Sequence, residues 1–369
     1  MELFSWIELF FIFSSIILLG YYLFFWRKLA IYSSLKNESS HLPAVSVVIC
    51  AKNEEKNLSQ FLPEIMSQEY PQYEVIVVDD CSLDRSLDVL QQFKNQYNNL
   101  IVYTFDKEKQ SFGKKEVLEY GIEKSKFDYL VLTDADCKPN SKKWLQGMVN
   151  GFLDGSEIVL GVGQYQKEKT IINDLIQMDT GFIAMNYLSF ALAGFPYMSV
   201  GRNVAYKKDL FFKVGGFKSH YDITSGDDDL FVNQISKHTK PSIVFSSDYQ
   251  TTSIPKESLK SFFLQKVRHV SAGVKYNKKN TALLSLFYSL SVVWYLVLPF
   301  VLCSSKQLFV ISTIIILKKL IMYSLIRRIF SKIEVSTKSA MLLFVEFFSV
   351  FFHSFAVIVT IFKSKKGKW

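Results

Sequence analysis

The residues best suited to chemistry are carboxylates that follow short apolar runs. Asp134 and Asp136 come directly after the run at 127–133. Two carboxylates two residues apart at the end of a strand can converge on one Mg²⁺ or Mn²⁺ ion, because these hard cations prefer oxygen ligands and often share them with substrate phosphates. A surface acidic pair is the alternative, and the position after an apolar run favours the metal site.

A second acidic pair, Asp79 and Asp80, ends the run at 73–80. A carboxylate at the end of a buried strand can accept hydrogen bonds from a nucleotide base or a ribose hydroxyl. We favour this role over a turn with solvated carboxylates. For Asp84, the better explanation is an N-cap of the helix that follows.

A third acidic group consists of Asp227, Asp228 and Asp229, behind Gly226. Three adjacent carboxylates repel one another, so we expect at least one raised pKa unless a cation compensates. A raised pKa suits a general base. A capped, solvated helix start is equally compatible with these residues, because acids favour the first turn of a helix.

A basic pair, Lys114 and Lys115, opens a predicted helix behind Gly113. A lysine at a helix N-terminus opposes the macrodipole but is well placed for a phosphate. An exposed basic pair explains these residues equally well. The chain has no complete GxxxxGK[ST] or GxGxxG motif, so neither a P-loop nor a dinucleotide-binding fold is supported.

The elements that must position these residues alternate between strands and helices. Strands are expected at 45–50, 73–80, 100–105 and 127–136, with helices near 55–68, 84–96 and 113–124. This alternation predicts an α/β fold with a doubly wound, parallel sheet, in which ligands bind beyond the carboxyl ends of the strands. Further strands are expected at 157–163, 197–206 and 242–253, and the helix at 174–192 carries polar residues that favour a buried or interfacial position over a membrane span.

Long apolar segments flank this region. Residues 3–26 are almost continuously apolar and are followed by Arg27 and Lys28, which predicts a retained anchor with the chain from residue 27 onward in the cytoplasm. A polar linker is expected at 33–43. Residues 257–275 predict either an amphipathic helix on the membrane or a surface helix of the globular domain.

Three further apolar stretches lie at 283–303, 308–326 and 341–362, of which two or three are expected to cross the membrane. A full crossing by the last stretch would put the basic tail at 363–368 outside, against the positive-inside rule. The tail stays inside if 341–362 is re-entrant or interfacial, or if an earlier segment fails to cross.

The charge distribution separates the two ends of the chain. The net charge is +9, but residues from 251 onward hold 18 Lys and Arg against 3 Asp and Glu. This pattern argues against a soluble nucleic-acid binder and for a basic, membrane-associated C-terminal region. Apolar residues make up 49% of the chain, which excludes a disordered protein. The four cysteines lack the spacing of a zinc site.

Eight motifs occur in order along the chain: VSVVICAKNEE, VIVVDDCSLD, GKKEVLEYG, LVLTDADC, VGRNVAY, GGF, SGDDDLF and QKVRH. Together they resemble membrane-bound family 2 glycosyltransferases with a GT-A fold. The resemblance implies an N-terminal transmembrane anchor at 1–32, a GT-A domain at 44–255, an interface helix at 256–280 and two or three membrane helices within 281–369.

The resemblance also implies site residues. Those assigned to a nucleotide-sugar are Ala51, Asn53, Glu55, Asp79, Asp80, Lys114, Asp134, Gln265 and Arg268. Of these, Asp79 and Asp80 hold the uracil side of a UDP-sugar, and Lys114 contacts the diphosphate. The implied cofactor is Mg²⁺ or Mn²⁺, held by Asp134 and Asp136.

Asp228 matches the family's general base, with Asp227 beside it. Gln265 and Arg268 match the Q and R of a QxxRW motif that closes over the diphosphate, but His269 replaces the tryptophan. That tryptophan stacks at the acceptor site of polymerising relatives, so the replacement puts processive synthesis in doubt.

The implied activity is an inverting transfer of a sugar from a nucleotide-sugar to an acceptor at the membrane, either a lipid-linked or a cell-envelope glycan. The implied location is the bacterial inner membrane, with several spans and a cytoplasmic catalytic domain. Three alternatives stay open: a nucleotidyl or sugar-phosphate transferase, a scaffold that binds nucleotide without turnover, and a transporter component with a degenerate soluble domain.

Overall fold

The computed structural model describes residues 5–33, 42–110, 113–153, 155–223, 225–236 and 239–364. The chain divides into two compact units. We call residues 33–166 and 194–256 the sheet unit, and residues 1–32, 167–193 and 257–369 the helical unit. Most of the linker expected at 33–43 and of the basic tail at 363–368 lies outside the described residues.

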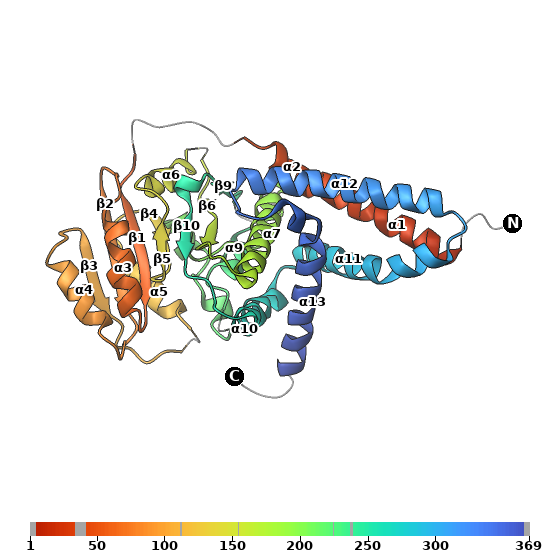
Figure 1. Ribbon diagram of the computed structural model, residues 1–369. Helices are drawn as coiled ribbons and strands as arrows, with labels where there is room; N and C mark the ends of the chain where they lie inside the picture. Colours follow the sequence, from red (N-terminus) through yellow and green to blue (C-terminus); the bar gives the residue numbers. More distant parts are fainter. Residues whose placement is uncertain are drawn as a thin grey trace. The chain divides into compact units, whose positions relative to one another are not determined.

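The sheet unit contains a seven-stranded sheet of the order β3-β2-β1-β4-β8-β6-β9 within the described part of the chain (Figure 1). Its strands are β1 (Val45–Ala51), β2 (Tyr73–Asp79), β3 (Leu100–Thr104), β4 (Tyr129–Leu132), β6 (Ile158–Leu160), β8 (Val204–Lys207) and β9 (Ser242–Ile243). The first four strands pair in parallel, whereas β8 is antiparallel to both β4 and β6. The expected α/β fold with a mostly parallel sheet is therefore confirmed.

A second, smaller sheet has the order β5-β10-β7, formed by β5 (Cys137–Pro139), β10 (Thr251–Ser253) and β7 (Gly163–Tyr165). Two runs expected as single strands are split between the sheets. The run at 157–163 gives β6 and then β7, and the run at 242–253 gives β9 and then β10, because the chain leaves the larger sheet and joins the smaller one within each run. Of the run at 197–206, only the end from Val204 is a strand.

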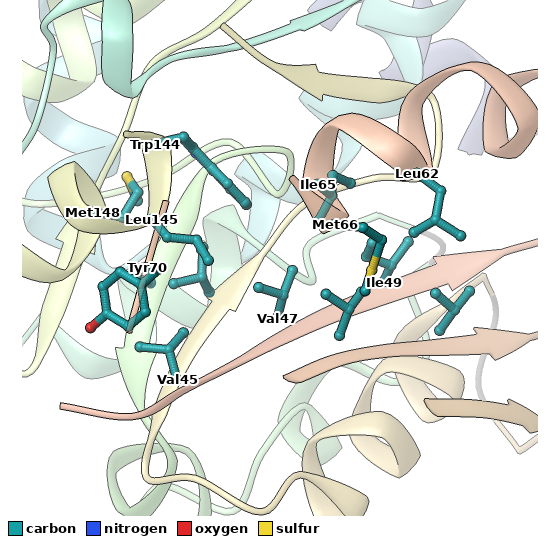
Figure 2. Close-up of a cluster of buried hydrophobic side chains, with 14 of the residues drawn as sticks. Val45, Val47, Ile49, Leu62, Ile65, Met66, Tyr70, Trp144, Leu145 and Met148 are labelled. Atoms are coloured by element: carbon teal, nitrogen blue, oxygen red, sulfur yellow. The ribbon is translucent and has the colours of Figure 1, made fainter. Parts of the chain in front are cut away.

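Helices cover both faces of the parallel part of the large sheet. Figure 2 shows β1 residues such as Val47 packed between α3 (Glu55–Met66) and side chains of α6 (Trp144–Asn150). On the other face, α5 (Lys115–Lys124) approaches so closely that a Cβ at Gly121 would lie 2.7 Å from Val48. Burial on both faces explains why these strands read as unbroken apolar runs.

The remaining helices of the sheet unit are short. They are α4 (Ser86–Lys94), α8 (Lys208–Lys213), α9 (Asp229–Ile235) and the 3₁₀ turns η2 (Lys218–His220) and η3 (Ser247–Tyr249). Both α4 and α9 follow acidic loops, so the start of each helix falls close to the candidate chemistry.

The helical unit consists of long apolar helices and short connectors. Its elements are α1 (Trp6–Tyr21), the π-helical turn η1 (Tyr22–Trp26), α2 (Arg27–Ile31), α7 (Ile171–Ala193), α10 (Leu259–Val270), η4 (Ser271–Lys275), α11 (Lys278–Ser304), α12 (Leu308–Lys332), η5 (Ser339–Leu343) and α13 (Val345–Ser364). Within the described part of the chain, four segments are long and apolar enough to cross a membrane: Trp6–Ile31, Lys278–Ser304, Leu308–Lys332 and Val345–Phe362. As expected, α7 is mostly buried and is not among them.

Candidate active site

The carboxyl ends of β1, β2 and β4 meet at one edge of the large sheet. The strands are parallel and adjacent, and their register places Ala51 beside Asp79. Polar loops follow all three strands at this edge, which is where open α/β sheets bind their ligands. The expected convergence of the first, second and fourth runs is therefore present.

Hydrogen bonds join the loop after β1 to the loop after β2. The N–H of Asn53 donates to Ser82 Oγ at 2.9 Å, and the Asn53 side chain accepts from Leu83 N–H at 2.7 Å. Asn53 adopts a positive φ of 57°, which asparagine tolerates better than most residues. The expected N-cap at Asp84 is wrong by one residue, because Arg85 is the N-cap of α4. Asp84 still accepts from the N–H of Ser86 at the start of α4 and from Glu55 N–H.

Asp79 and Asp80 are buried, with 2% and 8% of their surface exposed, so the solvated turn is excluded. Asp79 Oδ2 accepts from Ser82 N–H at 3.1 Å, while Asp79 Oδ1 has no hydrogen-bond partner among the described residues. Leaving a buried carboxylate oxygen without a donor is costly. This oxygen therefore fits a ligand that presents an N–H or O–H group.

Asp80 lies between two lysines. Its Oδ2 atom contacts Lys109 Nζ at 2.5 Å and Lys52 Nζ at 3.3 Å. The backbone N–H of Asp80 donates to Ala51 O at 2.8 Å, which ties the two strand ends together. Sequence reasoning did not single out either lysine.

Lys114 precedes α5 and forms ion pairs with two of the acidic groups. Its ammonium group contacts Asp134, and it lies 3.1 Å from Asp227. Burial disfavours the charged form, but the two carboxylates outweigh burial and raise the pKa of Lys114 well above its usual value. The motifs around 114, 134 and 227 are thus brought together.

Lys115 is fully buried, so the exposed basic pair considered from the sequence is wrong. Its ammonium group donates to the carbonyl oxygens of Ser225, at 2.8 Å, and Ile223. It therefore holds the chain just before the third acidic group. A sequence signal was available, because Lys115 shares one helix face with the buried residues Leu118 and Ile122.

Asp134 and Asp136 form the candidate metal site. Ligand atoms of these carboxylates and of Cys137 lie within 4.8 Å of one another. Burial, followed by the charge of Asp134, raises the pKa of Asp136. Burial also raises the pKa of Cys137 well above its usual range, which keeps it a neutral thiol. Two crowded carboxylates beside a thiol fit a hard divalent cation bound through oxygen.

Arg202 supports this site through contacts with β7 and β10 of the smaller sheet. Sequence reasoning did not identify it. Its guanidinium donates to Gly163 O at 2.9 Å and to Ser253 Oγ at 3.0 Å, and its main-chain oxygen accepts from Thr133 Oγ1 at 3.0 Å. Arg202 thereby fixes the residue that immediately precedes Asp134.

Asp228 is the N-cap of α9, and two backbone donors hold its carboxylate. Its carboxylate accepts from Asp229 N–H at 2.8 Å and from Gly201 N–H at 2.6 Å. Burial and the negative charge of Asp227 raise the pKa of Asp228 to about 6. For Asp227, the Lys114 charge outweighs burial and lowers the pKa. The sequence left open whether this acidic group caps a helix or holds a carboxyl group with a raised pKa. Asp228 does both.

Gln265 and Arg268 lie on α10, in the helical unit, and Arg268 is exposed together with His269. Their contact with a diphosphate stays a prediction.

Residues 46–215 match glycosyl transferase family 2. A stretch of 197 residues is 34% identical to the glycosyltransferase AglE of Haloferax volcanii, covering 51% of this chain and 60% of that relative. A second relative is the dolichyl N-acetyl-alpha-D-glucosaminyl phosphate 3-beta-D-2,3-diacetamido-2,3-dideoxy-beta-D-glucuronosyltransferase of Methanococcus voltae. It is 27% identical over 254 residues, covering 62% of this chain and 72% of the relative. The chain thus spans less than two thirds of AglE.

Among solved structures, the chain is similar to the mannosyltransferase PcManGT from Pyrobaculum calidifontis, which was determined in complex with GDP-Man and Mn²⁺. The TM-score is 0.56 at 18% identity, with 92% of this chain and 99% of that one covered. At this identity the likeness establishes the GT-A-like fold alone. Residues 46–215 therefore form a glycosyl transferase family 2 domain.

Proposed function

We propose that the protein is an inverting glycosyltransferase that moves a sugar from a UDP-sugar to an acceptor at the membrane, either a lipid-linked or a cell-envelope glycan. The observation that carries the proposal is that one lysine joins two of the acidic groups: Lys114 forms ion pairs with both Asp134 and Asp227. A site that holds several carboxylates and cations at one sheet edge suits a ligand with a polar base, a diphosphate and a metal.

The donor base is proposed to bind at Asp79, with Asp80, Ala51, Asn53 and Glu55 forming the surrounding loops. Uracil presents a single ring N–H between two carbonyl groups. The buried and partnerless Asp79 Oδ1 atom is an acceptor of matching character. The hydrogen bonds that join the two loops keep this acceptor in place before the donor arrives.

Asp134 and Asp136 are proposed to hold Mg²⁺ or Mn²⁺. When bound, the cation supplies positive charge that offsets the diphosphate as it departs. Thr133, fixed by the main chain of Arg202, keeps Asp134 in position. Lys114 and, by family resemblance, Gln265 and Arg268 add donors around the same diphosphate.

Transfer is proposed to occur in one displacement. The acceptor hydroxyl oxygen forms a bond to the anomeric carbon from the face opposite the nucleotide, and the carbon–oxygen bond to the diphosphate breaks with its electron pair on the diphosphate. Asp228 takes the hydroxyl proton, assisted in its placement by Asp227. A pKa of about 6 leaves Asp228 ionised at neutral pH and still able to accept that proton.

The membrane setting supports an acceptor attached to lipid. Four described helices are candidate spans, and the Methanococcus voltae relative is named for a dolichyl phosphate sugar. Arg27 and Lys28 after the first span favour a cytoplasmic catalytic domain. We propose the bacterial inner membrane as the protein's location.

His269 stands where polymerising relatives have a tryptophan. This replacement favours the addition of single sugars over processive synthesis.

The test is incubation of membranes containing the full chain with a panel of radiolabelled nucleotide-sugars and Mn²⁺ or Mg²⁺, followed by lipid extraction. The proposal expects label from one UDP-sugar in the lipid fraction, with inverted anomeric configuration. Label in a long polymer contradicts single addition. Binding of UDP-sugars without any transfer or hydrolysis supports the scaffold alternative and overturns the enzymatic proposal.

A further inference from the structure

The fourth apolar helix, α13, differs from the other candidate spans in length. Its apolar part, Val345–Phe362, has 18 residues, whereas α11 has 27 and α12 has 25. At 1.5 Å per residue these 18 residues extend about 27 Å, and the whole of α13, Val345–Ser364 with 20 residues, extends about 30 Å, which is the least that the ~30 Å hydrocarbon core requires. A crossing would also place the lysines of 363–368 on the side opposite Arg27 and Lys28, against the positive-inside rule.

Among the other three spans, α1 packs beside both α11 and α12 (Figure 1). At one end, Ser305 in the turn after α11 donates to Glu8. Further along, Trp294 Nε1 donates to Ser15 Oγ at 2.7 Å. At the other end, Lys332 donates to the carbonyl oxygen of Leu29 at 3.4 Å. That second end, which we call the basic end, carries Arg27, Lys28, Lys278, Lys279, Arg327, Arg328 and Lys332.

α13 starts near the middle of these helices and not at either end. Glu346, in its first turn, is fully buried and accepts from Tyr295 OH at 2.7 Å. It also pairs with the fully buried Lys318 at 3.3 Å and accepts from Tyr22. Tyr295 lies nine residues before the end of α11, and Lys318 lies ten residues after the start of α12. The N-terminus of α13 is therefore at mid-depth.

From there α13 returns toward the basic end. Tyr288, which bonds His353 Nδ1 at 3.1 Å, is seven residues closer than Tyr295 to the start of α11. At the middle of α13, Phe355 stacks on Phe263 of α10, with ring centroids 5.3 Å apart. In Figure 1, α13 runs across α11 and beside α10. Near the end of α13, Thr360 Oγ1 donates to Val267 O at 3.2 Å, so α13 ends beside the last turn of α10, which leads into the start of α11.

α10 is unsuited to the hydrocarbon core. Its 12 residues extend about 18 Å and include Lys260, Lys266 and Arg268. Lys266 pairs with the buried Asp179 of α7 at 2.8 Å, and His353 of α13 contacts the same carboxylate at 2.9 Å. This shared carboxylate fixes α10 and α13 as one layer.

The outer surface of α13 is apolar, and α10 adds exposed apolar residues beside its exposed Lys260, Arg268 and His269. The exposed hydrophobic side chains of the two helices are Leu259, Leu264, Phe355, Val357, Ile358, Ile361 and Phe362. The polar residues of α13, by contrast, lie on its buried side: Glu346, Ser349, His353 and Thr360. A helix with one apolar face and one polar, protein-facing side is suited to the membrane interface.

We propose that the chain crosses the bilayer three times, through Trp6–Ile31, α11 and α12, and that α13 is a re-entrant arm. The arm starts at mid-depth beside the Lys318–Glu346 pair and returns with α10 to the membrane surface at the basic end. The segment between η5 and α13 is the single residue Phe344, whose side chain is exposed. Its N–H donates to Met341 O at 2.9 Å and its carbonyl oxygen accepts from Phe348 N–H at 2.8 Å, so its backbone groups are satisfied internally, as this depth requires. The lysines after α13 then lie on the same side as Arg27 and Lys28.

The first test uses labelling by a membrane-impermeant maleimide in sealed vesicles of each orientation. Cys303, native and exposed near the far end of α11, serves as the reference in a chain whose other cysteines are serine. The second chain lacks all native cysteines and carries Phe362→Cys at the end of α13. The proposal expects the two cysteines to be labelled from opposite sides of the membrane. Labelling of both from the same side overturns it.

A second measurement covers the case in which the cysteine-free chain fails to fold. Nitroxide labels at Phe347→Cys, Phe355→Cys and Phe362→Cys, one at a time in the otherwise native chain with Cys81 and Cys303 replaced by serine, report depth through collisions with oxygen and a nickel chelate. A re-entrant arm gives a depth that decreases steadily from 347 to 362. A spanning helix gives its greatest depth at 355, which contradicts the proposal.

Discussion

Each acidic group of the candidate site already has a lysine beside it. Asp80 contacts Lys52 and Lys109, while Asp134 and Asp227 share Lys114. A nucleotide-sugar brings negatively charged phosphates to this site. The same lysines can therefore exchange their carboxylate partners for phosphate oxygens when the donor binds. Asp79 Oδ1 is a buried carboxylate oxygen with no donor among the described residues, so it is a place where the ligand can supply one.

Replacement of the proposed base is the sharpest change at a single residue. Asp228→Asn removes the proton acceptor but keeps an oxygen for the Gly201 and Asp229 N–H groups, so we expect transfer to fall about 10²- to 10⁴-fold with donor affinity retained. Turnover and UDP-sugar affinity are measured together. Asp209→Asn, an exposed acid in the first turn of α8, is the matched control and should leave both unchanged.

The pH dependence tests the same carboxylate in the native chain. Burial and Asp227 raise the pKa of Asp228 to about 6. Because the base must be ionised, kcat/KM should fall about tenfold per pH unit below 6 and reach a plateau above 7. A rate that stays constant from pH 5 to pH 8 would remove Asp228 from the proton transfer.

Asp79 gives a prediction about donor recognition. Asp79→Asn replaces one acceptor oxygen by a donor group, so a base N–H aimed at that position loses its partner. We expect UDP affinity, measured by calorimetry, to weaken about 10- to 100-fold. Asp88→Asn, on the exposed side of α4, should bind UDP as the native chain does; equal weakening in both variants would point to a general loss of charge.

The sequence reveals these carboxylates because each follows a buried strand, where chain direction alone places it at the ligand-binding edge. It does not reveal which groups Lys115 and Arg202 contact, although the helix face of Lys115 indicates its burial. Lys115 reaches Ile223 and Ser225, and Arg202 reaches Gly163 and Ser253, so their partners lie far away in the sequence. Such roles depend on tertiary packing, which no local pattern encodes.

At the scale of elements, the position of α5 controls where Lys114 and Lys115 lie. Gly121 lets this helix approach β1 and β2, since a Cβ there would lie 2.7 Å from Val48 and 3.0 Å from Val78. The strands and helices up to residue 132 follow the sequence pattern closely, because alternating apolar runs determine them. The splits at 157–165 and 242–253 do not, because a change of sheet leaves the apolar pattern intact.

Enlarging Gly121 should therefore disturb the site from a distance. Gly121→Leu forces α5 away from the sheet, and we expect a loss of about 1–3 kcal/mol in stability together with a clear drop in donor affinity. Thermal unfolding and UDP binding provide the two readouts. Glu123→Leu adds the same side chain on the exposed face of α5 and should change neither.

At the scale of the whole molecule, the chain combines an acidic sheet unit with a basic helical unit. Length and hydropathy predict the four apolar segments, because a membrane span requires little beyond composition. They do not predict the turn of α13 at mid-depth, which depends on Glu346 finding Lys318, Tyr22 and Tyr295 on three other helices. In the sequence, this turn is indicated by the basic tail, since a fourth crossing would place the tail on the side opposite Arg27 and Lys28.

The central claim is glycosyl transfer from a nucleotide-sugar at the carboxylate edge of the sheet unit. It is tested most directly by quantifying the nucleotide product per sugar incorporated by the purified full chain, alongside an Asp136→Asn variant. The account predicts one nucleoside diphosphate per transferred sugar, no pyrophosphate, and loss of both release and transfer in the variant. Release of pyrophosphate, or unchanged transfer by the Asp136→Asn chain, would contradict it.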